Sequence, residues 1–432
     1  MDKDRLLRQV KQEMMLAMGC TEPAAAALAG AKARDIVSLF GQPIEKIEIY
    51  ASRDLIKNAM GVGLPSCSLT GIQAAVALGV ASGCVSDGLG ILSHITPEQV
   101  EKAKSACTRL MMVNDVPSLY VRVKVFTKDH TGDATIISEH DNFADLKADG
   151  VLLESSPAVK HDSPCKEKKA VSDDEMGSLS LDEILAIASS VTEEDGQFLL
   201  DAVDTNMKIA LHGLEHQYGL SVGKVAMEEL NVPPRNLSEA FAYAAALAAS
   251  GSDARMAGCN MGVVINSGSG NQGITVTVPV YVLSEYLKSD RASLVRALFI
   301  SQTVGLVLTA RKDRLSALCG AFTASIATAC AYVYLLGGDR AVMDRVLNVM
   351  VGDLTGIICD GAKMTCPLKI HSSLSAAGLA VRIAFEGLGP GSKSGICGND
   401  SLQAINSLSR ISSEGMEETD KTILSIMLEK NC

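Results

Sequence analysis

The sequence predicts an α+β protein in which a large, mainly helical lobe accompanies a smaller lobe built on an antiparallel sheet. Apolar and charged residues alternate in SLYVRVKVF at 118–126, which is typical of a half-buried antiparallel strand. From residue 181 to the end, apolar residues recur with mainly helical spacing, broken by glycine-rich loops. A chain of 432 residues is long enough for two or three domains, so two lobes fit its length.

The first segment, residues 1–41, is predicted to form helices that pack on the larger lobe. Residues 4–18 have the spacing of an amphipathic helix, and Gly19 suits its C-terminal end. Thr21 suits the N-cap of a second helix that runs to about Leu39, with an acidic residue and a proline in its first turn.

The smaller lobe is predicted to span residues 42–155. Residues 47–51 alternate as a strand does, and the strand at 118–126 is followed by a turn and a return strand, ATIISEH, at 134–140. Between these strands, two segments are predicted to be helical, residues 63–83 and 97–111. This order of elements gives an α+β lobe.

A polar linker is predicted at 156–180, before the larger lobe at 181–432. The linker contains SPCKEKK and SDDEMGS, and Ser180 with Glu183 then forms a capping box for the next helix. The apolar stretch GITVTVPVYV at 273–282 is compatible with a strand or with the start of an apolar helix.

Charge and patterning limit the partners of the chain. Its net charge of −11 and the lack of a basic stripe with interleaved aromatic residues argue against nucleic-acid binding. The charged N-terminus lacks the apolar stretch of a signal peptide, which predicts a cytoplasmic protein. An uncharged run at 315–338 is long enough to cross a bilayer, but its Ser and Thr residues favour a buried helix.

Twelve cysteines in a cytoplasmic chain are not expected to form a disulfide framework, and most are interpreted as small buried residues. One exception is Cys20 in GCTEP, because a thiol at a helix N-terminus has a lowered pKa. Taken alone, this stretch fits an ordinary buried cysteine at a helix junction better.

A second group of cysteines lies far along the chain, in LCGAF and IICDGAKMTCPLKI. It comprises Cys319, Cys359 and Cys366, and Asp360 with Lys363 supplies an acid–base pair beside Cys359. The six-residue gap between the last two cysteines matches neither a zinc finger nor a ferredoxin run, so spacing alone also allows cysteines of a core turn.

A glycine-rich loop, NSGSGNQG at 266–273, is predicted to bind an anion such as a carboxylate or phosphate. Its glycine, serine and asparagine residues leave many backbone N–H groups available, although the pattern is not a Walker A loop. By contrast, His212 and His216 share a helical face in HGLEH without the metalloprotease pattern, and they are interpreted as ordinary surface or core histidines.

Together, the stretches GCTEPAAAALA, NSGSGNQGI, LCGAF and GDLTGIICDGAKMTCPLKI resemble the L-cysteine desulfidase family, which is related to iron–sulfur L-serine dehydratases. The resemblance covers nearly the whole chain. It implies an oxygen-sensitive [4Fe–4S] cluster whose metal ligands are Cys20, Cys319 and Cys359, with Cys366 as a reserve candidate. It also implies a small amino-acid substrate, allows a homo-oligomer, and gives neither nucleic acid nor a membrane as a partner.

The activity that the resemblance implies is β-elimination on L-cysteine, giving sulfide, pyruvate and ammonia. An iron without a protein ligand would act as a Lewis acid on the leaving group. Lys363 is the expected base, with Asp360 or Glu22 as orienting partners. The expected substrate-binding residues are Thr21, Asn266, Ser267, Gly268, Ser269, Gly270, Asn271 and Gln272.

Three alternatives stay open. The first is an L-serine dehydratase on the same scaffold. The second is a pyridoxal-phosphate enzyme, because SGSGN is similar to the carboxylate-binding loops of such enzymes, although no lysine upstream stands in a convincing Schiff-base context. The third is a non-catalytic protein that binds a small anion or amino acid and whose cysteines are inert.

Overall fold

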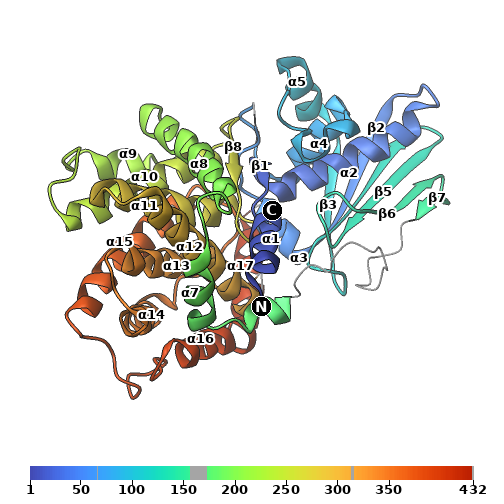
Figure 1. The fold of residues 1–432 in the computed structure, drawn as a ribbon. Helices are drawn as coiled ribbons and strands as arrows, with labels where there is room; N and C mark the ends of the chain where they lie inside the picture. Colours follow the sequence, from blue (N-terminus) through green and yellow to red (C-terminus); the bar gives the residue numbers. More distant parts are fainter. Residues whose placement is uncertain (66, 156–172, 313–315, 431–432) are drawn as a thin grey trace.

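A computed structural model describes residues 1–432 except 66, 156–172, 313–315 and 431–432. Figure 1 shows two lobes side by side: a large helical lobe and a smaller one in which helices cover a six-stranded sheet. The predicted α+β class is therefore confirmed. Of the predicted linker at 156–180, residues 156–172 lie outside the described residues, and the boundaries between domains stay predictions.

The N-terminal segment differs from its prediction in two ways. Helix α1 (Lys3–Glu13) ends early, and strand β1 (Leu16–Met18) pairs antiparallel with β8 (Gly262–Val264) of the larger lobe. Helix α1 packs on the larger lobe, as expected, with Leu6 and Val10 in its core. Helix α2 (Thr21–Ser38) instead lies on the sheet of the smaller lobe, where its alanines share a core with the strands.

The sheet of the smaller lobe is mixed rather than purely antiparallel. Its strand order is β3-β2-β4-β5-β6-β7, in which β2 and β3 run parallel and the other neighbours antiparallel. The predicted strands at 47–51 and 118–126 are confirmed, but the predicted helix at 97–111 ends early because its last residues form β3. The strands are β2 (Ile44–Ser52), β3 (Thr108–Val113), β4 (Tyr120–Thr127), β5 (Thr131–Ile137), β6 (Phe143–Ala148) and β7 (Val151–Ser155).

Four helical elements complete the smaller lobe: α3 (Arg53–Ala59), α4 (Gly71–Ser82), the 3₁₀ turn η1 (Val85–Gly90) and α5 (Pro97–Ser105). The contact between α2 and α4 is close because both helices carry small residues. A Cβ atom added at Gly79 of α4 would lie 2.0 Å from the backbone oxygen of Ala27 in α2. The smaller lobe therefore depends on a backbone-to-backbone approach that only glycine allows.

We expect Gly79→Ala to lower the free energy of unfolding by about 1–3 kcal/mol, because the added methyl group forces α2 away from α4. Urea denaturation measures this change. Gly356→Ala is the control, since a Cβ atom there would meet nothing within 4 Å. Equal losses of stability in the two variants would contradict the packing argument.

The larger lobe is helical, as predicted, and the capping box of Ser180 and Glu183 is confirmed at the start of α7. The open question at 273–282 is resolved as helix, since these residues lie within α11. Its helices are α6 (Asp173–Gly177), α7 (Leu181–Ser190), α8 (Gln197–Glu215), α9 (Val222–Met227), α10 (Leu237–Met256), α11 (Gly270–Leu287), α12 (Arg291–Lys312), α13 (Gly320–Leu335), α14 (Arg340–Leu354), α15 (Cys366–Phe385), α16 (Ser401–Arg410) and α17 (Glu417–Glu429), with a π turn η2 (Ile411–Gly415) between the last two.

The centre of the larger lobe consists of apolar helices. Helix α13 accounts for most of the uncharged run at 315–338, and its residues Ala321–Val333 are buried. Among the described residues, α12 is the helix with the length and composition to cross a membrane, and 83% of its apolar window is buried inside the protein. Core helices of soluble proteins also meet this criterion, so it is weak evidence for a membrane span.

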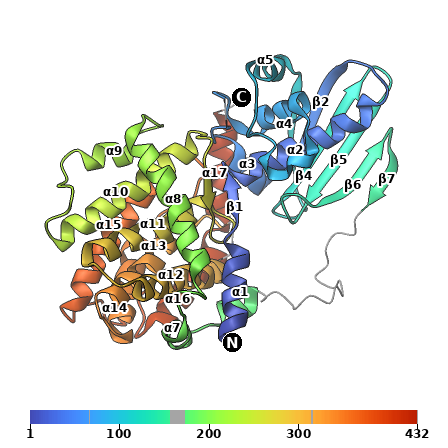
Figure 2. The ribbon, with the colours of Figure 1, turned by 45° about the horizontal axis from the view of Figure 1, so that its top comes forward.

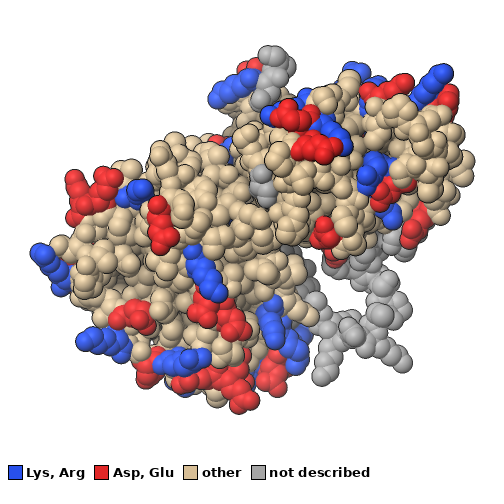
Figure 3. Space-filling model, turned by 90° about the horizontal axis from the view of Figure 1, so that it is seen from above, with Lys and Arg blue, Asp and Glu red and all other residues tan. Residues whose placement is uncertain are grey.

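Charged residues of both signs are interspersed on the face of the molecule drawn in Figure 3, mostly along its edges. The centre of that face is largely uncharged.

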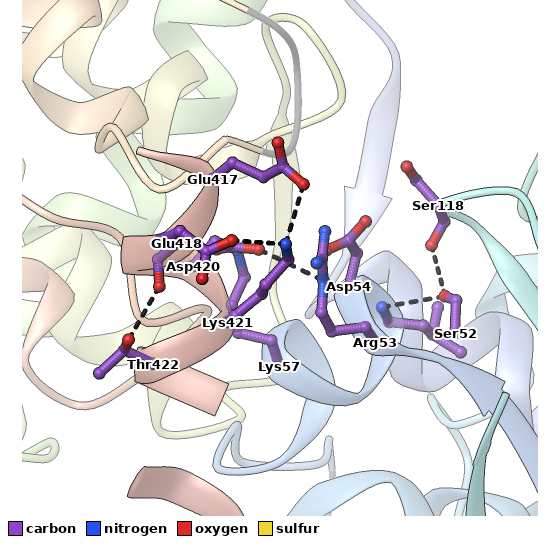
Figure 4. A network of polar contacts seen from close by, with 11 residues as sticks. Ser52, Arg53, Asp54, Lys57, Ser118, Glu417, Glu418, Asp420, Lys421 and Thr422 are labelled. Carbon is purple, nitrogen blue, oxygen red and sulfur yellow. Dashed lines mark hydrogen bonds and ion pairs between the residues drawn. The ribbon is translucent and has the colours of Figure 1, made fainter. Parts of the chain in front are cut away.

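The last helix returns to the smaller lobe. Figure 2 shows α17 between the two lobes, beside α3. Its Leu424 belongs to the core of the smaller lobe, and its Asp420 pairs with Lys57 of α3 at 2.5 Å (Figure 4). Both side chains of this pair are buried. The C-terminal helix thus joins the two lobes at their junction, where the candidate site also lies.

Candidate functional site

Two of the predicted cysteines lie side by side because their segments pair as a short antiparallel bridge. Leu318 pairs with Ile358, the N–H of Cys319 donates to the Ile357 carbonyl at 3.0 Å, and the N–H of Cys359 donates to the Ala317 carbonyl at 2.6 Å. Residues 40 positions apart in the sequence are therefore held together by main-chain hydrogen bonds, independently of the thiols.

The thiol of Cys319 donates a hydrogen bond to the sulfur of Cys359, and this contact separates their pKa values. It lowers the pKa of Cys359 to about 5, with help from the positive charge of Lys57 and the N–H of Gly361, against the opposing effect of burial. The same bond, together with burial, raises the pKa of Cys319. Cys359 is therefore a thiolate at neutral pH, which is the form that binds metals.

Cys20 and Cys366 complete the group of cysteines. Cys20 forms a small buried cluster with Val62 and Met256, and Cys366 packs against that cluster. The lowered pKa expected for Cys20 at a helix N-terminus is wrong, because burial and the nearby Glu22 carboxylate raise it. The charges of Asp360 and, more weakly, of Cys366, Cys359 and Cys20 act on the ammonium group of Lys363 and raise its pKa, against the larger effect of burial.

Three of these cysteines stand at helix N-termini. Cys20 is the N-cap of α2, Cys319 is the N-cap of α13, and Cys366 is the first residue of α15. None of these three helices has a side-chain cap, so their first N–H groups remain available. The positive dipole end of each helix therefore lies at one of these cysteines and favours an anionic group there.

The donor set fits a multinuclear cluster better than a single metal ion. Sulfurs bound to one zinc ion lie within about 4.6 Å of one another, twice the usual Zn–S distance of about 2.3 Å. Among the described residues, the cysteines form no group of three with sulfurs within 4.8 Å of one another. Thiolate character, burial and three helix N-termini are what an anionic iron–sulfur cluster requires.

Glu22 lies against Cys20, as the sequence suggested. Its carboxylate accepts from the Cys20 thiol at 2.9 Å, from Thr21 Oγ1 at 3.3 Å and from Asn58 Nδ2 at 3.3 Å. Burial opposes its ionisation, but His140, the Cys20 thiol and Arg255 outweigh burial and lower the pKa of Glu22. Glu22 is thus an anion in the site.

Lys363 points into the junction between the lobes, whereas Asp360 has another partner than expected. Lys363 Nζ donates to the Lys57 carbonyl at 3.0 Å and to its neighbour's carbonyl, and burial lowers its pKa. Asp360 forms an ion pair with Lys369, not with Lys363. The reason is helical geometry: Lys369 lies in the first turn of α15 and faces back toward the loop.

The glycine-rich loop contributes less to the site than expected. Asn266 is fully buried and donates to Gln302, and Ser267 lines a small pocket between α1 and α12. Ser269 caps α11 through the N–H of Gln272. Gly268 has a positive φ of 77° and lies between these two serines.

Two members of the loop do lie beside the cysteines. Asn271 Nδ2 contacts the sulfur of Met256, which packs on Cys20, and its Oδ1 accepts from Ser252. Gln272 packs against Gly320, the residue after Cys319: a Cβ atom there would lie 2.8 Å from its Nε2. Gly270 lies directly over the guanidinium group of Arg255.

Sequence reasoning missed several charged residues of the site, namely Lys57, His140, Arg255 and Lys369. Of these four, only Lys369 lies in one of the stretches that carry the family resemblance. Arg255 had a detectable signal, because it stands with Asp253 in the last turn of an alanine-rich helix, where buried charges are rare.

A separate group lies on α8. Ligand atoms of His212, Glu215 and His216 are within 4.8 Å of one another, and His212 Nε2 is 3.0 Å from the hydroxyl of Tyr218. Glu215 and His216 are exposed. This partner for His212 agrees with the interpretation of these histidines as ordinary side chains.

Comparison with known proteins adds a family and several relatives. The profile of the serine dehydratase alpha chain family matches residues 86–425. A protein of Oleidesulfovibrio alaskensis, named UPF0597 protein, is 37% identical over 431 residues, covering 99% of this chain and 98% of its own. Proteins of the same name match from Aeromonas hydrophila subsp. hydrophila, at 36% over 98% of this chain and 95% of theirs, and from Parabacteroides distasonis, at 33% over 100% and 99%.

Proposed function

The chain belongs to the serine dehydratase alpha chain family, and from this premise we propose that it is an iron–sulfur-dependent lyase. Its reaction would be β-elimination on L-cysteine, giving sulfide, pyruvate and ammonia, in the cytoplasm. The single observation that supports this proposal is the bridge that pairs the segments of Cys319 and Cys359, next to the uncapped helix N-terminus at Cys319, and Cys20 stands at another uncapped helix N-terminus.

Cys20, Cys319 and Cys359 would hold a [4Fe–4S] cluster, with Cys366 as the reserve candidate. The bound cluster supplies a Lewis acid, at an iron without a protein ligand, that accepts the departing sulfur of the substrate. The chain's own groups support this chemistry before any metal is bound. The thiolate of Cys359 is already formed, and the positive charge of Lys57 stabilises it.

Lys363 is the base in this proposal, because its amine lies among the cysteines in the junction between the lobes. It takes the α-proton, the electrons of the Cα–H bond form the Cα=Cβ bond, and the Cβ–S bond breaks. The aminoacrylate product hydrolyses with water to pyruvate and ammonia. In this proposal Thr21, which bonds Glu22, and Asn271, which bonds Met256, contact the substrate, and Glu22 orients its ammonium group.

The substrate is tested with protein purified and assayed without oxygen. We expect sulfide and pyruvate in equal amounts from L-cysteine, with a higher kcat/KM than for pyruvate from L-serine. A higher kcat/KM for L-serine would contradict the assignment of L-cysteine as the substrate. It would favour the second candidate, a serine dehydratase, which the family name supports. Lys363→Ala should abolish turnover of both amino acids while the cluster absorbance stays.

A further inference from the structure

We propose that Arg255 is the carboxylate anchor of the site, so that its substrates are small α-amino acids and not the corresponding amines. This inference rests on the proposed function and deepens it. The residues of the glycine-rich loop that were expected to hold a carboxylate are mostly engaged elsewhere, since Asn266 binds Gln302 and Ser269 caps a helix. A carboxylate therefore needs another partner.

Arg255 is buried and incompletely paired. Its side chain is in the last turn of α10, the residue is only 5% exposed, and Nη2 donates to the Gly19 carbonyl at 3.1 Å. Its Nε is buried and has no hydrogen-bond partner. A buried donor without a partner destabilises the fold, and more so when the group is charged, so its retention requires an explanation.

The position of Arg255 supplies that explanation. The Gly19 carbonyl that it contacts immediately precedes Cys20, and its charge acts on both Cys20 and Glu22. The residue after it, Met256, packs on Cys20 and accepts from Asn271. The guanidinium group therefore lies at the edge of the cysteine group, on the side of Asn271.

The geometry of the guanidinium suits a carboxylate. Nε and Nη2 form the side-on fork that binds two carboxylate oxygens in parallel, and Nη2 keeps a second hydrogen beside the one given to Gly19. Glu22 lies nearby as an anion for the ammonium group of the same substrate. The two charges thus match the two charged groups of an α-amino acid.

Gly270 keeps the guanidinium in place. A Cβ atom at this position would lie 2.4 Å from Arg255 Nε and 2.8 Å from Cζ. Any side chain at 270 would therefore push the guanidinium aside without changing its charge. Gly270→Ala therefore moves the guanidinium group, whereas Arg255→Met removes it.

The test uses anaerobic, cluster-loaded protein and two ligands that do not require turnover. L-Alanine has the carboxylate and ammonium groups but no leaving group, and 2-aminoethanethiol has the amine and thiol but no carboxylate. Affinities are measured by calorimetry, together with KM and kcat for L-cysteine and L-serine. Iron content and absorbance show whether the cluster stays.

We expect Arg255→Met and Gly270→Ala to weaken L-alanine binding and raise KM by roughly 10- to 100-fold, the loss typical of a charge-assisted hydrogen bond. Affinity for 2-aminoethanethiol should change little. Arg255→Lys should have an intermediate affinity for L-alanine. The control is Arg311→Lys, which alters an arginine bonded to the Gly177 carbonyl, and its affinity and KM should match those of the wild type.

Wild-type affinity for L-alanine in Arg255→Met, or no L-alanine binding by the wild type, would overturn the inference. Loss of the cluster with unchanged affinity for L-alanine would also overturn it, because Arg255 would then only balance the charge of the thiolates. If L-alanine binding depends on Arg255 but no amino acid is turned over, the lyase proposal fails and the carboxylate anchor remains.

Discussion

Replacing Cys359 by alanine is expected to remove the cluster and to bring β-elimination below detection. Cys359 is the cysteine whose thiolate the site stabilises, through the Cys319 thiol and the charge of Lys57. Without Cys359, only Cys20 and Cys319 remain of the three proposed ligands, and these two come from distant segments. Iron and sulfide analysis of anaerobically purified protein, with the absorbance of the cluster, measures the loss.

Cys330→Ala is the matched control for this variant. Cys330 is fully buried in the larger lobe, within α13, whereas Cys359 is partly exposed, and burial raises the pKa of the Cys330 thiol to about 12. This variant should keep its iron. A cluster that survives Cys359→Ala but is lost in Cys366→Ala would contradict the assignment and make Cys366 the third ligand.

Replacing Asp420 by alanine is expected to lower the free energy of unfolding by about 3–5 kcal/mol, because it leaves the buried ammonium group of Lys57 without its carboxylate partner. Lys57 and Asp420 have side chains only 1% and 7% exposed, and the pair joins α3 to α17 (Figure 4). The Lys57 carbonyl also accepts from Lys363, so the loss should reach the site. Urea denaturation measures the stability.

Two comparisons separate the buried pair from ordinary surface charge. Glu418→Ala removes one of the two carboxylate partners of Lys421 on the exposed face of α17 and should cost about 0–1 kcal/mol. The double variant Lys57→Met with Asp420→Leu should recover most of the loss, since apolar residues replace a buried pair with little cost. A loss in Asp420→Ala no larger than that in Glu418→Ala would refute the argument.

The sequence located the strands with one buried face and the helices with clear caps, because local patterns determine them. It missed β3, because TRLMMV follows a helix without a proline or glycine between them. It placed α2 on the wrong lobe, because an alanine-rich helix buried on most sides shows no apolar face. The β-branched residues of α11 form a helix because they are buried all around, which overrides propensity.

The candidate site was predictable where residues lie in recognisable stretches. Cys20, Cys319 and Cys359 were named from such stretches; the structure pairs the segments of Cys319 and Cys359, and the charges of Cys20 and Cys359 both act on Lys363. Arg255 and Lys57 reach the site only through the packing of α10 and α3, which no local pattern encodes. The hydrogen bond between Cys319 and Cys359 depends on a bridge between segments 40 residues apart.

The most direct test of the central claim is Mössbauer spectroscopy of ⁵⁷Fe-labelled protein kept strictly without oxygen. The account predicts about four irons per chain. Roughly one quarter of the iron signal should be distinct, because one iron of the cluster has no protein ligand. Adding L-cysteine or L-serine should shift that part of the signal. The triple variant of Cys20, Cys319 and Cys359 to alanine should contain no cluster. Iron-free wild-type protein would contradict the account. A cluster whose Mössbauer signal does not change when L-cysteine or L-serine is added would contradict it as well.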